Sequence, residues 1–211
     1  MAADWGTFVT NMKLTFATPN EKTIEDIAKI HATEYINAVK TATTIMTYSK
    51  ASMIESSKGD IQNSFLEAFK TLQKIESPLS PNYKGDSPNP NQDKDRSKIE
   101  EIFLPVAKKI KDSWEKEIFT PATMPPPYVS PNPGYKVSLG GDPIELSKGL
   151  AYAFFISQKS INSESAAADF LSALVKAYTK HLLTIVGVFN GLIPSPGGPV
   201  PGPPFPFIGV A

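Results

Sequence analysis

The placement of proline constrains this chain more than any other feature. Of the 20 prolines in its 211 residues, four lie in residues 77–97, six in residues 120–142 and seven in residues 191–211. Proline fixes φ and lacks a backbone N–H, so it interrupts helix interiors and central strands. These segments predict an N-terminal helical part (1–76), a polar linker (77–97), a second helical part (98–190) with a proline-rich loop (120–142), and an extended C-terminal arm (191–211).

Apolar residues repeat at helical spacing between the proline-rich segments. The pattern predicts a series of helices. The first follows Asp4 as its N-cap, the next covers 23–49, and the next begins at Asp60 and stops before Pro78. The remaining helices cover 97–118, begin at Asp142, and cover 163–190. Extended patterns are confined to Tyr128–Val129 and Tyr135–Leu139, which predict at most a hairpin around 131–134. The predicted fold class is therefore mainly α: a helical bundle with long proline-rich extended loops and an extended C-terminal arm.

Local signals suggest where several of these helices begin and end. Ser97 with Glu100 has the form of a capping box, and Asp142 followed by Pro143 is a strong helix start. Pro105 is expected to kink its helix or to mark that helix's first turn. Asn190 with Gly191 predicts the C-cap of the last helix. The second half of that helix is apolar almost all round, which indicates that neighbouring subunits cover it.

Composition argues against several classes of partner. Lys and Arg number 21, as do Asp and Glu, and Arg96 is the only arginine, so we expect no nucleic-acid partner. The chain has no cysteine, which excludes disulfides and cysteine-based metal sites and fits a reducing compartment. No signal peptide is recognised, and the apolar stretch Leu182–Ile193 is shorter than the ~20 residues of a membrane helix. We therefore expect a soluble protein without a membrane partner.

No residue pattern predicts catalysis, metal binding or a cofactor. His31 and His181 are the only histidines, and both lie in apolar helical patterns without a nucleophile motif or metal-ligand spacing beside them. The weakest alternative is an enzyme of unrecognised type that uses one of these histidines. The prediction is a protein without enzymatic activity, metal or cofactor.

Two short proline motifs have the form of peptide-recognition sites. Pro125, Pro126, Pro127 and Tyr128 match the P-P-x-Y form that WW domains bind, and Pro196–Pro204 contains the P-x-x-P spacing of SH3 ligands. An adaptor that presents these motifs is the alternative hypothesis. The favoured interpretation is that both segments are stiff spacers laid over a neighbouring protein.

The segments "TMPPPYVSPNPGYKVSLGG" and "IPSPGGPVPGPPFPFIGVA", each after a predicted helix, resemble those of small virion structural proteins of T4-like tailed phages of marine bacteria. The lysine-rich, arginine-poor composition fits the same resemblance. It implies a tail, baseplate, neck or capsid accessory protein, made in the host cytoplasm and located in the virion. It supplies no functional residues.

The resulting hypothesis is a non-enzymatic structural protein whose proline-rich arms bind other structural proteins or copies of the same chain in an oligomeric assembly. The uncharged tail is interpreted as a segment that becomes buried in that assembly. The predicted partner-binding residues are Pro125, Pro126, Pro127, Tyr128, Pro196, Pro199, Pro204, Phe205, Phe207, Ile208 and Val210.

Overall fold

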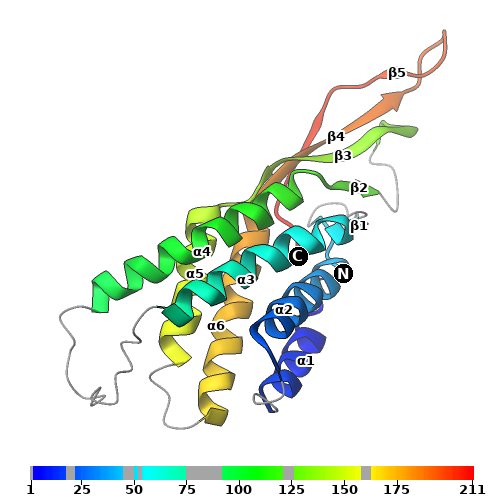
Figure 1. Cartoon of the computed structure of the whole chain (residues 1–211). Coiled ribbons are helices and arrows are strands. Elements are labelled where there is room, and N and C mark those ends of the chain that lie inside the picture. Colours follow the sequence, from blue (N-terminus) through cyan, green and yellow to red (C-terminus); the bar gives the residue numbers. More distant parts are fainter. Residues whose placement is uncertain are drawn as a thin grey trace.

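The computed structural model describes residues 2–17, 22–44, 50–51, 54–74, 92–120, 126–157 and 163–211. Within these ranges the fold is mainly helical, as the sequence predicts, and it also contains a six-stranded antiparallel sheet. The helices are α1 (Trp5–Ala17), α2 (Ile24–Val39), α3 (Lys58–Lys74), α4 (Gln92–Trp114), α5 (Pro143–Ser157) and α6 (Ser163–Leu183), with a 3₁₀ turn, η2 (Ile54–Ser57). The strands are β1 (Lys50–Ala51), β2 (Ile118–Thr120), β3 (Ser130–Gly140), β4 (Ile185–Ile193), β5 (Val200–Pro201) and β6 (Phe205–Ile208). Figure 1 shows the helices gathered in one body and the sheet extending away from one end of it.

Two helices begin where their capping residues predict. Asp4 lies directly before α1, and its carboxylate accepts a hydrogen bond from the backbone N–H of Thr7 at 3.0 Å. Asp142 lies directly before α5 and accepts from the N–H groups of Ile144 and Glu145 at 2.9 and 3.1 Å. These bonds satisfy donors that a helix N-terminus otherwise leaves unpaired.

Other predicted helix boundaries are wrong. Helix α4 begins at Gln92, so Ser97 lies inside the helix and does not cap it. Pro105 lies in the interior of α4, where it removes one backbone hydrogen bond. Helix α2 ends at Val39 rather than near residue 49, because Thr43 and Thr44 pair instead with the C-terminal residues.

The prediction that neighbouring subunits cover the last helix is also wrong. Helix α6 packs against α5 on one side and α1 on another. Tyr178 is fully buried and its ring stacks on Trp5 of α1 at 5.6 Å, while Phe170 contacts Phe154 of α5 at 4.9 Å. Leu171, Leu174 and Leu182 are likewise buried within this chain.

The apolar residues after α6 form a strand and not the end of a helix. Strand β4 lies between β3 on one side and β5 and β6 on the other, and alternate residues from Ile185 to Phe189 are buried. Alternation with period two is the pattern of a strand, although a short apolar run also fits a helix. Asn190 and Gly191 therefore lie inside β4, and the predicted C-cap is wrong.

The proline-rich loop is also strand over much of its length. The predicted extended segment Tyr135–Leu139 is confirmed, but it belongs to the single strand β3, which pairs with β2 and β4. The predicted hairpin around residues 131–134 is wrong, because those residues continue β3 with an irregular register.

The C-terminal residues fold back on their own chain, which contradicts the prediction of an extended arm that needs a partner to order it. Strand β6 pairs with β4 from Val186↔Ile208 to Phe189↔Phe205. Phe207 and Val210 are completely or almost completely buried in the same core as the helices. Prolines are compatible with β5 and β6 because both strands lie outside β4 at the edge of the sheet.

Residues 43–44 and 50–51 contact the sheet at two separate edges. Thr43 and Ala211 exchange two backbone hydrogen bonds of 2.8 and 2.9 Å next to the Thr44↔Val210 bridge. A few residues later, β1 pairs with β2. The ring of Phe119 in β2 also contacts that of Phe207 at 5.7 Å, so the two edges share a core. Among the described helices, none combines the length and the apolar character needed to span a membrane.

Gly187 allows β6 to approach β4 closely. A Cβ atom at this position would lie 2.3 Å from the carbonyl oxygen of Lys136 and 2.3 Å from the ring of Phe207. Overpacking a core typically costs about 1–3 kcal/mol. We expect Gly187→Ala to lower the free energy of unfolding by that amount in urea denaturation. Gly59→Ala is the matched control, since a Cβ there meets nothing within 4 Å, and an equal loss in both variants would contradict the expectation.

Candidate functional site

The sheet carries strands well beyond the helical body, and we call this projection, residues 126–140 and 185–208, the β-arm (Figure 1). Its tip is a turn between β4 and β5, where the carbonyl of Ser195 accepts a hydrogen bond of 3.0 Å from the N–H of Gly198. Pro196 fixes one φ angle of this turn, and Gly198 has a φ of 110°, which glycine adopts without strain. The tip is therefore a defined turn and not an extended polyproline helix.

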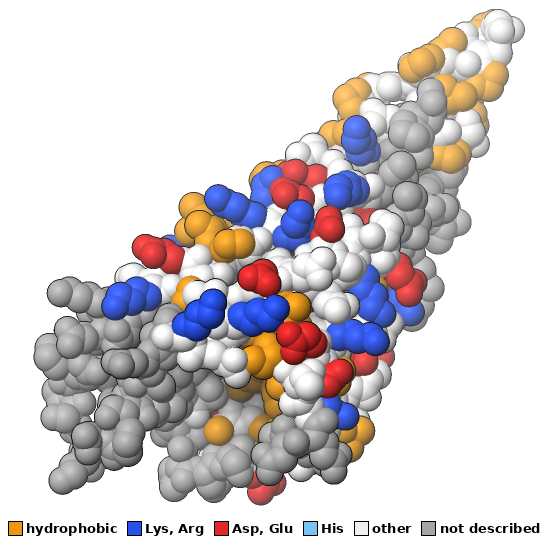
Figure 2. Space-filling view, in the orientation of Figure 1, with side chains coloured by type: hydrophobic (Ala, Val, Ile, Leu, Met, Phe, Trp, Pro, Cys, Tyr) orange, Lys and Arg blue, Asp and Glu red, His pale blue; other side chains and the backbone are white. Residues whose placement is uncertain are grey.

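The β-arm exposes apolar side chains and almost no charge. Lys136 is its only charged residue, and residues 185–208 contain none. Ile208 is 65% exposed and Val200 is 42% exposed, and Val129 and Leu139 are also exposed. In Figure 2 the outer part of the projection is mostly orange and white, whereas red and blue atoms cover the body. This surface is suited to contact with another apolar surface.

The structure separates the predicted partner-binding residues into exposed and buried groups. Pro126, Pro127, Pro196, Pro199, Pro204 and Ile208 are exposed. Phe205 is half-buried, while Phe207 and Val210 belong to the core of their own chain. Pro125 lies outside the described residues.

Tyr128 is part of the β-arm's own packing. It is only 7% exposed, and its hydroxyl donates a hydrogen bond to the carbonyl of Pro203. Its ring also meets that of Phe189 edge to face, with the centroids 4.9 Å apart. The side chain that a WW domain would bind is therefore already in contact with the same molecule.

A second surface of interest is a groove at the end of the helical body away from the sheet, which we call the end groove. Its volume is about 530 Å³, and five helices contribute to it. The side chains that define it include Phe16, Ile27, Leu72, Phe154 and Phe170. None of its lining residues is Lys, Arg, Asp or Glu.

His31 lies at the buried side of the end groove. Its Nε2 atom is 2.7 Å from the hydroxyl of Tyr178, and its ring stacks on Phe65 at 4.2 Å. Burial lowers the pKa of His31 to about 3, and burial also raises the pKa of Tyr178. Both groups are therefore neutral at physiological pH, and the pair links α2 to α6.

His181 is buried where α6 meets the loop before α5. Neither of its ring nitrogens makes a well-formed hydrogen bond with the described residues, although the backbone of Gly140 lies close enough to act on its pKa, and a Cβ on Gly141 would lie 2.4 Å from its Nε2. Burial lowers its pKa to about 4, although the Asp142 carboxylate opposes this effect. Within the described residues, no group of three or more His, Asp or Glu side chains is placed to hold a metal ion.

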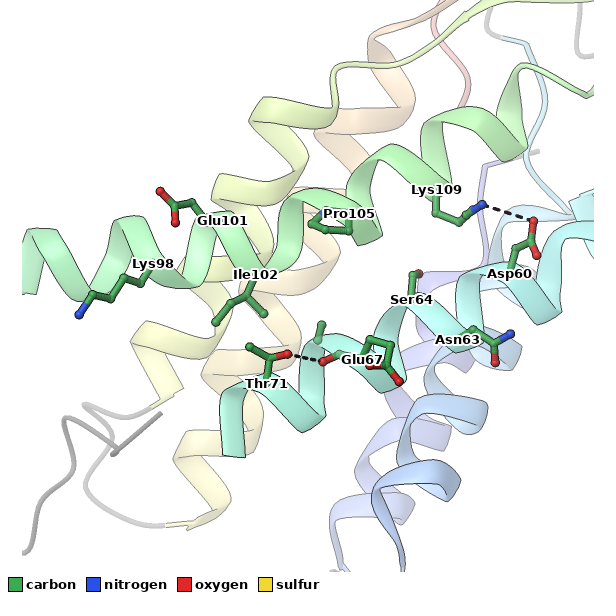
Figure 3. A pocket seen from close by; sticks show the side chains of 11 residues that line it. Asp60, Asn63, Ser64, Glu67, Thr71, Lys98, Glu101, Ile102, Pro105 and Lys109 are labelled. Atoms are coloured by element: carbon green, nitrogen blue, oxygen red, sulfur yellow. Dashed lines mark hydrogen bonds and ion pairs between the residues drawn. The ribbon is translucent and has the colours of Figure 1, made fainter. Parts of the chain in front are cut away.

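A third hollow lies between α3 and α4 and is polar at its rim. It has a volume of about 770 Å³, and Lys109 forms an ion pair of 3.6 Å with Asp60 at one end. Figure 3 shows Ile102 pointing from α4 toward α3, while Lys98 and Glu101 point away from the hollow. Pro105 has no N–H to donate to the carbonyl of Glu101, which leaves that carbonyl without its usual helical partner. The long charged side chains at the rim are those of ordinary solvated helix faces.

Sequence reasoning identified the tail but not the end groove. Phe16, Phe69, Phe154 and Phe170 each fit a core position of one helix, and only the packing of five helices leaves them around a common hollow. Comparison with protein-family models, with curated proteins and with solved structures finds no match for this chain, so its function is argued from these surfaces alone.

Proposed function

We propose that this chain is a non-enzymatic structural protein of an assembled particle and that it contacts neighbouring subunits through the β-arm. The observation that carries the proposal is a projecting sheet that exposes Val129 and Val200 in its outer part and Leu139 and Ile208 at its base, with Lys136 as its only charge. Exposed sheet edges in monomeric proteins are usually protected by charged side chains. Prolines protect the edge strands β5 and β6 in place of charges, so it is the exposed apolar faces of the arm that are suited to burial against another protein.

The local structure of the arm favours tight docking. Complete burial of an exposed aliphatic side chain contributes roughly 1.5–3 kcal/mol, and the side chains of the arm, which are 42–65% exposed, have about half of that still to gain. The hydrogen-bonded turn at Ser195–Gly198 and the neighbouring prolines already fix the tip, so little conformational entropy is lost on binding. The arm is therefore organised before it meets a partner.

The particle implied by the resemblance in the proline-rich segments is a virion. In this proposal the chain is made in the host cytoplasm and is incorporated as a tail, baseplate, neck or capsid accessory component. Its partners are copies of itself or other structural proteins of the particle.

The adaptor alternative has weaker support. A WW domain requires an accessible Tyr128, which is buried, and an SH3 domain requires an extended segment where residues 195–198 form a turn. Mutation of Tyr128 would abolish partner capture by an adaptor. In an assembly protein, partner binding would instead depend on the exposed side chains of Val200 and Ile208.

A photo-crosslinking amino acid at Ile208 tests the proposal in purified protein and in assembled material from its native source. We expect irradiation to give discrete adducts whose mass exceeds one chain, identified by mass spectrometry. Leu14 on α1 is the matched control, because it is 67% exposed but lies outside the β-arm. Equal adduct yields at both positions, or none at Ile208, would contradict an assembly role for the arm.

A further inference from the structure

We propose that the end groove of one molecule binds the tip of the β-arm of a second copy, so that copies join head to tail. This inference rests on the proposed assembly function and names the partner and its docking site. The contact joins an aromatic, uncharged groove to a proline-rich, uncharged turn.

The groove has the chemistry of a proline-binding surface. Phe16, Phe69, Phe154 and Phe170 line it from four different helices, and their rings offer a large apolar contact surface to the proline and valine side chains of a compact turn. His31 does not add charge, because it is buried and paired with the hydroxyl of Tyr178. A charged peptide would find no partner for its charges among the lining residues.

The tip of the β-arm has the matching character. Pro194, Pro196, Pro199 and Val200 are all exposed around the turn, and no charged residue lies within residues 185–208. A two-stranded turn is also narrow, since paired strands lie about 4.7–4.9 Å apart. The tip is therefore a compact apolar projection of a size to enter a hollow between helices.

The β-arm leaves the body at the C-terminal end of α6, whereas the helix ends whose residues line the end groove lie at the opposite end of the body (Figure 1). The groove includes Phe16 near the C-terminal end of α1 and Ala167 near the N-terminal end of α6, whereas β4 follows the C-terminal end of α6. Helix α6 has 21 residues and so spans about 30 Å. The arm therefore points away from its own groove, and a contact between these two different patches joins successive copies into a ring or a filament.

Two charge substitutions test the contact without disturbing the core. Gly197→Glu places a carboxylate on the tip, where a Cβ meets nothing within 4 Å, and Ala167→Glu places one in the groove, where the side chain is half-buried. Their controls are Gly59→Glu, at an equally open glycine, and Ala168→Glu, at an exposed residue outside the groove. Circular dichroism and thermal melting establish that each variant is folded.

Light scattering after size exclusion measures the outcome. The wild-type chain and both controls are expected to give masses that rise with concentration and do not fall with added salt, because the contact contains no ion pair. Gly197→Glu and Ala167→Glu are each expected to remain monomers. Mixed together, they are expected to form a 1:1 dimer, since the intact tip of one variant meets the intact groove of the other.

Three results would overturn the head-to-tail contact. In the first, the wild-type chain is monomeric at high concentration. In the second, Gly197→Glu abolishes assembly but Ala167→Glu does not. In the third, a mixture of the two variants stays monomeric. In each case, adducts from Ile208 to a different protein would leave the proposed assembly function standing. Absence of any adduct would remove both proposals.

Discussion

Stopping the chain after Asn190 is expected to unfold the sheet end of the protein, because the residues that follow supply part of its core. The truncation removes Phe207 and Val210, both almost completely buried, and the backbone bonds between Thr43 and Ala211. Replacing a core phenylalanine by alanine alone costs about 3–5 kcal/mol. Since native domains are stable by only about 5–15 kcal/mol, the loss is close to the whole stability.

Point variants measure the same effect in a chain of full length. We expect Phe207→Ala to lower the free energy of unfolding by about 3–5 kcal/mol in urea denaturation followed by circular dichroism. Ile208→Ala is the control, because that side chain is 65% exposed, and its loss is expected to stay within about 0.5 kcal/mol. Similar losses in the two variants would show that the tail does not contribute to the core as the structure indicates.

This expectation changes how assembly should be tested. A shortened chain would lose its fold and its arm together, so a change in its mass would not report on assembly. Gly197→Glu alters the arm without removing any residue of the core.

Acidification is expected to destabilise the protein between pH 6.5 and about 5, where carboxylates of ordinary pKa are still largely ionised. The pKa of His31 falls from 6.5 to about 3 and that of His181 to about 4, in both cases because burial disfavours the charged ring. The unfolded chain therefore binds two more protons than the folded one in this range. The free energy of unfolding then decreases as the pH falls, with a slope that approaches about 2.7 kcal/mol per pH unit for two such groups.

Urea denaturation over a series of pH values measures this slope. Each of His31→Gln and His181→Gln is expected to reduce it by about half, whatever the variant does to stability at neutral pH. The carboxylate of Glu145 contributes only at lower pH, because hydrogen bonds from Lys180 and Lys148 lower its pKa from 4.5 to about 2. A double variant with an unchanged slope would mean that the histidines are not the groups responsible.

The features predicted correctly from the sequence are those that depend on neighbouring residues. Asp142 caps α5 through N–H groups two and three residues away, so the signal and the structure lie in the same short segment. The beginning of β4 was assigned to a helix because a short apolar run fits both periods. Its strand partners, β3 and β6, come from distant parts of the sequence and decide the outcome.

The candidate site was predicted in part for the same reason. The exposure of Pro196, Pro199 and Ile208 agrees with a binding role, but the same tail also carries Phe207, whose contacts with Phe119 and Gly187 no local pattern reveals. Apolar spacing indicates which side chains are buried. It does not indicate which of them bury one another and which remain beside a groove.

The pairing of Thr43 and Thr44 with Val210 and Ala211 has a consequence for the order of folding. These partners lie far apart in the sequence, whereas α5 and α6 are neighbours and pack on each other. Contacts of long sequence separation carry a large entropy of loop closure and form slowly, so the helices are expected to form first and the sheet to close last. The ordered surface of the arm is then expected to form only in molecules that have finished folding, so that assembly through the arm follows folding.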